Sequence, residues 1–223
     1  IMLGELKAEA QSIFDEDIAM CRCIGEYGAE LLKDGSAVLT HCNAGSLCAV
    51  EYGTALSPIY IAAEQGKRVK VYADETRPLL QGARLTAFEL SEAGIDTTVI
   101  CDNMAASLMQ HGKVDIIITG CDRVAANGDF ANKVGTLSLA INAKHFGVPF
   151  YVAAPSSTVD ESIPDGSEII VEQRCGLDIS DYWYSTPMVA PKAKCDYNPA
   201  FDVVPRELIT GFITEKGVTD SIV

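Results

Sequence analysis

The sequence is poor in basic residues: 17 lysines and arginines stand against 31 aspartates and glutamates among 223 residues, a formal net charge of −14. Binding to nucleic acids and to anionic membranes depends on basic side chains that neutralise phosphates, so this deficit argues against both partners. No apolar run approaches the roughly 18 to 20 residues that a bilayer crossing requires. Any anionic ligand must therefore be held by a local cluster of cations.

Signatures of cofactor and metal binding are also missing. The sequence has neither a glycine-rich dinucleotide fingerprint after its first predicted strand nor a Gly-Lys-Ser/Thr phosphate loop. The eight cysteines lack paired C-x-x-C spacing, and the three histidines (41, 111 and 145) lack the spacing of metal ligands. We therefore expect no cofactor, no metal and reduced thiols, as in a cytoplasmic protein, with a nuclear share left open.

With 48% hydrophobic residues, the chain has enough apolar side chains to build a core. Residues 3–33 carry apolar positions at roughly helical spacing and no signal-peptide pattern, which predicts a helical lead-in over 1–34. Because Ile1 precedes Met2, we expect the chain to be part of a longer protein.

From residue 35 to 223, short apolar runs alternate with longer segments of helical pattern. The predicted strands are 37–40, 69–73, 97–101, 115–119 and 149–153. The predicted helices are 46–65, 83–93, 104–111 and 133–145, with a closing helix over 206–216. Strands joined by helical crossovers run parallel. The sequence thus predicts one doubly wound α/β domain over 35–223, a mostly parallel Rossmann-like sheet with helices on both faces.

Polar side chains follow each predicted strand, at the edge where ligands bind in an open parallel sheet. Cys42 precedes a predicted helix opening at Gly45-Ser46, whose positive dipole end would bind a phosphate or lower the thiol pKa. Asp122 follows the fourth strand, where neighbouring isoleucines would desolvate its carboxyl group. The alternatives are that Cys42 serves packing and that Asp122 pairs with Arg123 or caps a turn.

Four cations also fall in these loops. They are Arg77, Arg84, Arg123 and Lys133. Each alone is typical of solvated surface, but together with the amides of Gln81 and Asn132 they would form a cradle for one phosphate.

The same loops resemble a known family. The matching segments are 40–45, 72–86, 120–129, 132–136 and 198–202. They are similar to methylthioribose-1-phosphate isomerases of the methionine salvage pathway, whose fold is shared with regulatory subunits of translation initiation factor 2B. The likeness runs through nearly the whole chain. Residues 1–36, however, do not match the family's helical N-terminal domain, which carries an Arg-Gly-Ala contact to phosphate and sugar.

The resemblance implies a cofactor-free isomerisation of 5-methylthioribose 1-phosphate to 5-methylthioribulose 1-phosphate. By this match, Cys42 and Asp122 occupy the positions of the catalytic cysteine and aspartate, and Gln81, Asn132 and Lys133 occupy substrate-binding positions. It also implies a homodimer and a site completed by the missing N-terminal portion of the same protein. A non-catalytic regulatory subunit and an isomerase of ribose 1,5-bisphosphate are the alternatives.

Overall fold

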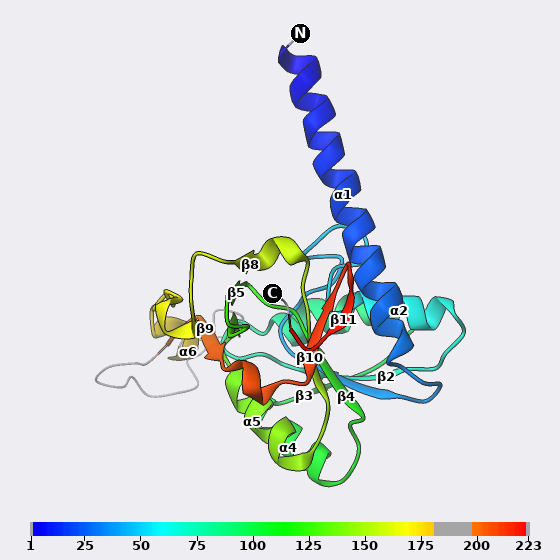
Figure 1. Ribbon diagram of the computed structural model, residues 1–223. Coiled ribbons are helices and arrows are strands. Elements are labelled where there is room, and N and C mark those ends of the chain that lie inside the picture. The colour runs from blue at the N-terminus through cyan, green and yellow to red at the C-terminus, as the bar shows by residue number, and fades with distance from the viewer. Residues whose placement is uncertain (1, 181–197, 222–223) are drawn as a thin grey trace.

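The computed structural model describes residues 2–180 and 198–221. A long helix, α1 (Met2–Glu30), leads into a seven-stranded sheet (Figure 1). In spatial order its strands are β11 (Gly217–Thr219), β10 (Gly211–Thr214), β7 (Phe150–Ala153), β4 (Ile116–Thr119), β1 (Ala37–Thr40), β2 (Lys70–Asp74) and β3 (Asp96–Ile100). Neighbouring strands are parallel except β10 and β11, which are antiparallel.

The strand order places a reversal of the chain in the middle of this sheet. The chain enters at β1, runs outward through β2 and β3, returns to β4 beside β1, and continues to the opposite edge through β7 and β10. This is the doubly wound order, in which ligands bind where the direction of winding reverses. The predicted parallel, doubly wound sheet is confirmed, and its reversal lies between β1 and β4.

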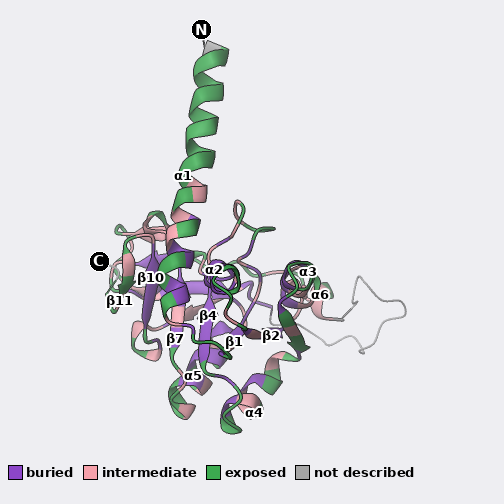
Figure 2. Ribbon diagram, turned by 90° about the vertical axis from the view of Figure 1, so that its right-hand side faces the viewer, coloured by how far each residue is buried: buried purple, intermediate pink, exposed green. Residues whose placement is uncertain are grey.

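Helices cover both faces of the large sheet. α1, α2 (Ser57–Glu64) and α3 (Ala87–Glu92) contribute to one buried core, and α4 (Ala105–Gln110) and α5 (Thr136–Phe146) contribute to the other. Successive side chains of a strand point to opposite faces, so Ile116 and Ile118 belong to the first core and Ile117 to the second. Both cores are apolar and lie directly against the central strands (Figure 2).

A second, smaller sheet was not predicted. Its strands, in order, are β8 (Val159–Asp160), β5 (Arg123–Ala125), β6 (Phe130–Lys133) and β9 (Phe201–Val204). β5 and β6 form an antiparallel hairpin whose turn contains Gly128 at a φ of 87°. With two to four residues each, these strands are too short to give a clear alternating pattern.

Two predicted helices begin later than expected. In the segment predicted as 46–65, α2 starts only at Ser57, and residues 46–56 form turns. Gly53 has a φ of 70°, and a Cβ there would lie 2.3 Å from the Gly45 Cα, so the chain doubles back instead of coiling. The predicted helix opening at Gly45-Ser46 is therefore wrong. The helix predicted over 133–145 starts at Thr136 because Lys133 ends strand β6.

The predicted closing helix over 206–216 is also wrong. Arg206–Leu208 form one 3₁₀ turn, and Gly211–Thr214 form β10, which pairs with β7 on one side and β11 on the other. Two sets of ladder hydrogen bonds and burial of all four residues outweigh local helix propensity here.

The remaining predicted elements are confirmed to within a few residues. The helix expected over 83–93 consists of a π-helical turn, Gly82–Thr86, followed by α3, and the helix expected over 104–111 opens with a 3₁₀ turn, Asp102–Met104. Further helical turns are Ser156–Thr158, Gly166–Glu168 and α6 (Leu177–Ser180). The boundary at residue 34 falls between α1 and β1, and the division into a lead-in and a catalytic domain stays a prediction.

Candidate active site

Cys42 and Asp122 follow the carboxyl ends of β1 and β4, the neighbouring strands at which the winding of the sheet reverses. Asp122 and Lys133 both act electrostatically on the Cys42 thiol. The three side chains are therefore near one another: Cys42 follows β1 of the large sheet, Asp122 lies between β4 and β5, and Lys133 ends β6 of the small sheet. This crevice is the place where the fold predicts ligand binding.

Cys42 adopts an uncommon backbone conformation. Its φ is 65°, in the left-handed region that non-glycine residues rarely occupy. Its N–H donates to Oγ1 of Thr76 at 2.8 Å, and its carbonyl accepts from Oγ1 of Thr86 at 2.7 Å. Both peptide groups that flank the half-buried thiol are thus fixed by side chains.

The Cys42 thiol is protonated at neutral pH. Burial raises its pKa to about 11 and Asp122 adds to the shift, while the Asn43 backbone and the Lys133 charge oppose it. The expectation that a helix N-terminus lowers this pKa is wrong, because turns and no helix follow Cys42. A protonated thiol is suited to donating a proton rather than to nucleophilic attack.

Asp122 is exposed, yet the protein around its carboxyl group desolvates that group enough to raise its pKa, against the charges of Lys133 and Arg174. The predicted direction is confirmed. Pairing with Arg123 is contradicted, because the Arg123 guanidinium binds Asp160 at 2.8 Å. A carboxyl group with a raised pKa is better matched to proton transfer near neutral pH.

The three predicted binding residues lie in different surroundings. Lys133 is about nine-tenths buried, and its ammonium lies 4.3 Å from the centroid of the Phe201 ring. Asn132 is also buried and donates from Nδ2 to Thr136 Oγ1 at 2.9 Å. Oε1 of Gln81 is buried without a hydrogen-bond partner among the described residues. A buried, unpaired amide oxygen is costly, and a ligand hydroxyl would satisfy it.

The expected cradle of four cations is rearranged in the structure. Arg77 donates to the carbonyls of Pro78 and Ile179, Arg84 donates to that of Leu79, and Arg123 pairs with Asp160. Lys133 is joined instead by Arg174, whose charge also acts on Asp122. The sequence offers no signal for Arg174, because its segment has neither strand nor helix periodicity.

His41 was given no role from the sequence, yet it connects three parts of the site. Its buried ring places Nδ1 2.9 Å from Oδ2 of Asp74 and Nε2 2.8 Å from the carbonyl of Val134. Burial lowers the pKa of His41, but the hydrogen bond to Asp74 and the charge of that carboxylate outweigh it and raise the pKa. Burial raises the pKa of Asp74 to about 6. His41 thus ties β1 to β2 and to the residue that follows Lys133.

The ligand atoms of His41, Asp74 and Asp102 lie within 4.8 Å of one another, a spacing that a cation could bridge. However, both ring nitrogens of His41 face acceptors, and the two Asp102 oxygens accept the N–H groups of Thr76 and Arg77 at 2.7 and 2.8 Å. A ring that donates from both nitrogens has no lone pair for a metal. These residues form a hydrogen-bonded network whose donors do not fit a metal ion.

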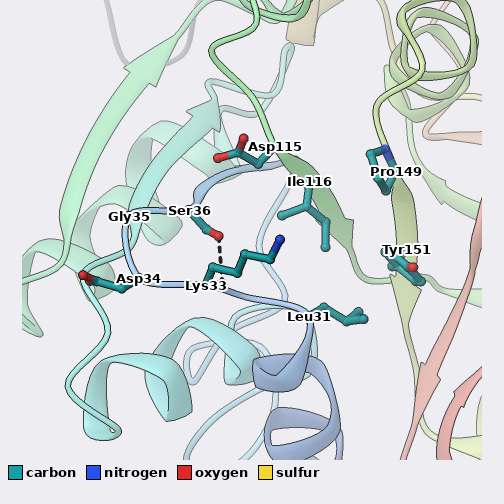
Figure 3. A pocket seen from close by; sticks show the side chains of 9 residues that line it. All are labelled: Leu31, Lys33, Asp34, Gly35, Ser36, Asp115, Ile116, Pro149 and Tyr151. Carbon is teal, nitrogen blue, oxygen red and sulfur yellow. Dashed lines mark hydrogen bonds between the residues drawn. The ribbon is translucent and has the colours of Figure 1, made fainter.

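Two cavities lie at opposite ends of the strands of the large sheet. One, of about 500 Å³, is lined by Asp122, Arg123 and residues 156–161. The other, of about 480 Å³, lies among Leu31, Lys33, Ser36, Asp115 and Tyr151, at the amino ends of β1, β4 and β7 (Figure 3). Only the first adjoins the carboxyl edge, where ligands bind in this kind of sheet.

Known proteins share this sequence over nearly its whole length. Residues 3–221 match the model of the initiation factor 2 subunit family. The chain is 59% identical, over 96% of its length, to methylthioribose-1-phosphate isomerase of Parabacteroides distasonis. It is 57% identical, over 94% of its length, to 5-deoxyribose 1-phosphate isomerase of Moorella thermoacetica. It spans 63% and 59% of the length of these two relatives.

Solved structures share the fold. The crystal structure of 5-methylthioribose 1-phosphate isomerase from Pyrococcus horikoshii has a TM-score of 0.89 and 46% identity, and the match covers 95% of this chain and 58% of that one. The delta subunit of translation initiation factor eIF-2B from A. fulgidus has a TM-score of 0.90 and 46% identity, with 95% and 61% covered. With its strand order, its strand-end site and these similarities, the chain belongs to the initiation factor 2 subunit family.

Proposed function

We propose that this chain carries the main part of the active site of an isomerase that converts 5-methylthioribose 1-phosphate to 5-methylthioribulose 1-phosphate in methionine salvage. The observation that carries the proposal is the meeting of Cys42, Asp122 and Lys133 where the winding of the sheet reverses. The names of its relatives at 55–59% identity support the same reaction.

The substrate sets a specific chemical problem. Its anomeric carbon carries the phosphate, so the sugar ring cannot open to a free aldehyde without a proton delivered to the ring oxygen. Asp122, whose pKa is raised, donates that proton and later takes the proton of the C2 hydroxyl. The hydrogen on C2 then moves to C1.

Two roles remain open for Cys42. In the first, the thiol gives up its own proton, takes the proton of C2 as a thiolate and returns it to C1 of the enediolate-like intermediate; in the second, the protonated thiol stabilises the transition state of a hydride transfer from C2 to C1. Partial burial of the site favours both, since developing charge away from water responds more strongly to fixed dipoles. Solvent deuterium appearing at C1 of the product would support proton transfer, and its absence would favour hydride transfer.

A second candidate substrate is 5-deoxyribose 1-phosphate, the sugar in the names of relatives at 54% and 57% identity. Both sugars carry an apolar group in place of the 5-hydroxyl, so one pocket of similar chemistry would serve either. The ratio of kcat/KM for the two substrates decides between them.

A regulatory subunit and an isomerase of ribose 1,5-bisphosphate have less support. A regulatory subunit has no need of a protonated thiol and a carboxyl group of raised pKa held beside a buried lysine. An isomerase of ribose 1,5-bisphosphate would need a second phosphate pocket for the 5-phosphate.

The relatives are longer than this chain, which supports a further part of the proposal: the N-terminal portion of a parent protein completes the substrate site. Leu3, Leu6, Ile13 and Phe14 on α1 are exposed, and such a portion would cover them. A homodimer, carried over from the family, and a cytoplasmic location, suggested by the free cysteines, complete the proposal.

The test is turnover of 5-methylthioribose 1-phosphate by the parent protein and by its Cys42→Ala and Asp122→Asn variants. We expect each variant to lose at least about a hundredfold in kcat, the scale of acid/base chemistry. Cys101→Ala, which removes an exposed thiol, is the matched control and should keep full activity. A folded parent without turnover on either sugar would move the function to a regulatory subunit.

A further inference from the structure

The backbone at Cys42 is held by two threonine hydroxyls that come from another part of the chain. Thr76 follows β2, and Thr86 ends the π-helical turn Gly82–Thr86. Both residues are wholly buried, so water does not compete for their hydroxyl groups. One hydroxyl accepts the Cys42 N–H and the other donates to the Cys42 carbonyl.

We propose that Thr76 and Thr86 are positioning residues, which hold Cys42 in its left-handed conformation and so set the direction of its thiol. This inference rests on the proposed function, in which that thiol takes part in the isomerisation. Without both hydrogen bonds, a cysteine at a φ of 65° would relax toward a more favourable region and carry its side chain with it.

The Thr76 hydroxyl is oriented by its own partners. It donates to the Asp74 carbonyl at 3.0 Å, which leaves its lone pairs for the Cys42 N–H. Thr76 itself has a φ of 65°, unusual for a β-branched residue, and its N–H donates to Oδ1 of Asp102 at 2.7 Å. Asp102 therefore holds Thr76, which in turn holds Cys42.

Thr86 belongs to a second line of hydrogen bonds. Its Oγ1 accepts from Nδ2 of Asn43 at 3.1 Å while it donates to the Cys42 carbonyl. The same Asn43 amide donates to buried Glu89, which also accepts the N–H and hydroxyl of Ser46. The peptide that follows Cys42 is thus fixed from α3 and the turn before it, where burial keeps the geometry rigid.

Thr119 is the matched control for removing a buried hydroxyl. It is also wholly buried, and its Oγ1 has no hydrogen-bond partner in the described part of the chain. Thr119→Val therefore makes the same chemical change without breaking a bond to Cys42.

The experiment compares Thr76→Val, Thr86→Val and Thr119→Val with the serine variants Thr76→Ser and Thr86→Ser, all in the parent protein. Two quantities are measured: kcat and KM for the sugar phosphate, and the rate of iodoacetamide labelling at Cys42, resolved from other thiols by mass spectrometry. The second needs no turnover, so it separates the positioning role from the proposed function.

We expect the valine variants at 76 and 86 to lose at least about tenfold in kcat with KM changed by less than about threefold, because misplacement of a reacting group lowers kcat. Labelling of Cys42 should rise by at least about fivefold as the loop loosens. The serine variants should recover most of both values, and Thr119→Val should match the wild type.

Three outcomes would overturn the inference. In the first, folded valine variants keep wild-type kcat and labelling. In the second, kcat falls only in parallel with thermal stability and serine restores neither. In the third, Thr119→Val has the same effects. If the wild-type parent shows no turnover, the proposed function fails and the labelling rates alone decide the role of the threonines. If Thr76→Val does not fold, Thr86→Val with its serine partner decides.

Discussion

At the scale of single residues, two glycines flank α5, and substituting them would distinguish the cost of a positive φ from the cost of a steric clash. Gly135 has a φ of 108°, and a Cβ there would lie 2.6 Å from Cε1 of His41. Gly147 has a φ of 70°, but no atom lies within 4 Å of its Cβ position. Alanine is strained at both positions and meets a neighbour only at the first.

We expect Gly147→Ala to lower the free energy of unfolding by about 1 kcal/mol, the cost of a positive φ alone. Gly135→Ala should cost at least about 3 kcal/mol, since it must also displace the buried His41 ring. Urea unfolding of both variants measures the difference. Equal losses would show that His41 moves aside freely and does not tie Val134 to the site.

The buried His41–Asp74 pair predicts how stability depends on pH. The pKa of His41 is raised by its partner, and burial raises that of Asp74 to about 6, so the folded chain binds protons more tightly than the unfolded chain at both groups. The contribution of His41 is complete below its unfolded pKa of about 6.5 and is lost as the pH rises through the higher folded value. Asp74 acts in the same direction from about pH 4 to 6.

We therefore expect the free energy of unfolding to fall through this pair as the pH rises from about 4 to beyond 6.5. His41→Gln should remove the share of His41 and leave that of Asp74, whose pKa rises further without the histidine, so the shape of the pH dependence should change. His111→Gln is the matched control: His111 is exposed and bonds only the carbonyl of Ser107 in the described structure, so the slope should persist. A slope that His41→Gln leaves unchanged contradicts the assignment.

Cys42 and Asp122 were found from the sequence because each follows a predicted strand, and Lys133 because it lies in the loop region beyond the fourth strand, since strand ends meet at one edge. His41 was not, since its partners lie 33 and 93 residues away and neither spacing leaves a local pattern. The direction of the Cys42 pKa shift was also predicted wrongly, because the prediction assumed a helix that opens at Gly45. That helix is absent because the chain at Gly53 folds back onto Gly45, a contact that leaves no local sequence pattern.

At the scale of elements, α1 contains glycines in opposite surroundings. A Cβ at Gly28 would lie 2.4 Å from Cγ of Pro58, because α1 and α2 pack at close range there. Gly4, near the start of the same helix, has nothing within 4 Å. Substitution by alanine raises helix propensity equally at the two positions, but only at Gly28 does the added methyl group clash with a neighbour.

We expect Gly4→Ala to leave global stability intact and to raise the helicity of the exposed turns, since alanine favours helix by about 1 kcal/mol over glycine. Gly28→Ala should lower the free energy of unfolding by about 2 kcal/mol through overpacking against α2. Circular dichroism and urea unfolding of the two variants test this. A stabilised Gly28→Ala protein would mean that α1 and α2 are not in close contact.

Elements with strong local periodicity were predicted well, and those defined by distant partners were not. The central strands are continuous apolar runs, and α3 and α4 follow closely behind turn signals. β10 was taken for a helix because its identity depends on β7 and β11, which lie beside it only in the folded chain. Local pattern carries no information about such pairing.

At the scale of the whole molecule, the first half of α1 extends away from the body (Figures 1 and 2). Residues 3–16 are exposed, whereas Cys21, Ile24 and Ala29 are buried. A helix whose apolar side chains lie in water is only marginally stable by itself. The exposed half is therefore expected to open often in this chain.

Hydrogen exchange measured on this chain and on a longer parent tests that expectation. The amides of residues 3–16 should exchange at least about tenfold more slowly in the parent, because a covered helix opens less often. The amides of residues 21–29 should change little and serve as the internal control. Equal exchange over residues 3–16 would mean that no part of the parent packs on α1.

The doubly wound order could be inferred from the alternation of strands and helices, since crossover rules leave few other arrangements. The small sheet could not, because its strands are drawn from segments as far apart as Arg123 and Val204. Asn132 and Lys133 of the candidate site lie on that small sheet. Sequence patterns therefore revealed the residues of the site more completely than the strands that hold them.

The two ends of the chain are joined through α1, which packs against β10 and β11 as well as α2. During synthesis the buried face of this helix, which includes Ile24, leaves the ribosome before β10, whose Ile213 belongs to the same core. Contacts so distant in sequence slow folding and leave apolar surface open to aggregation meanwhile. A nascent chain halted before β10 would thus be a substrate for chaperones, however complete its central strands.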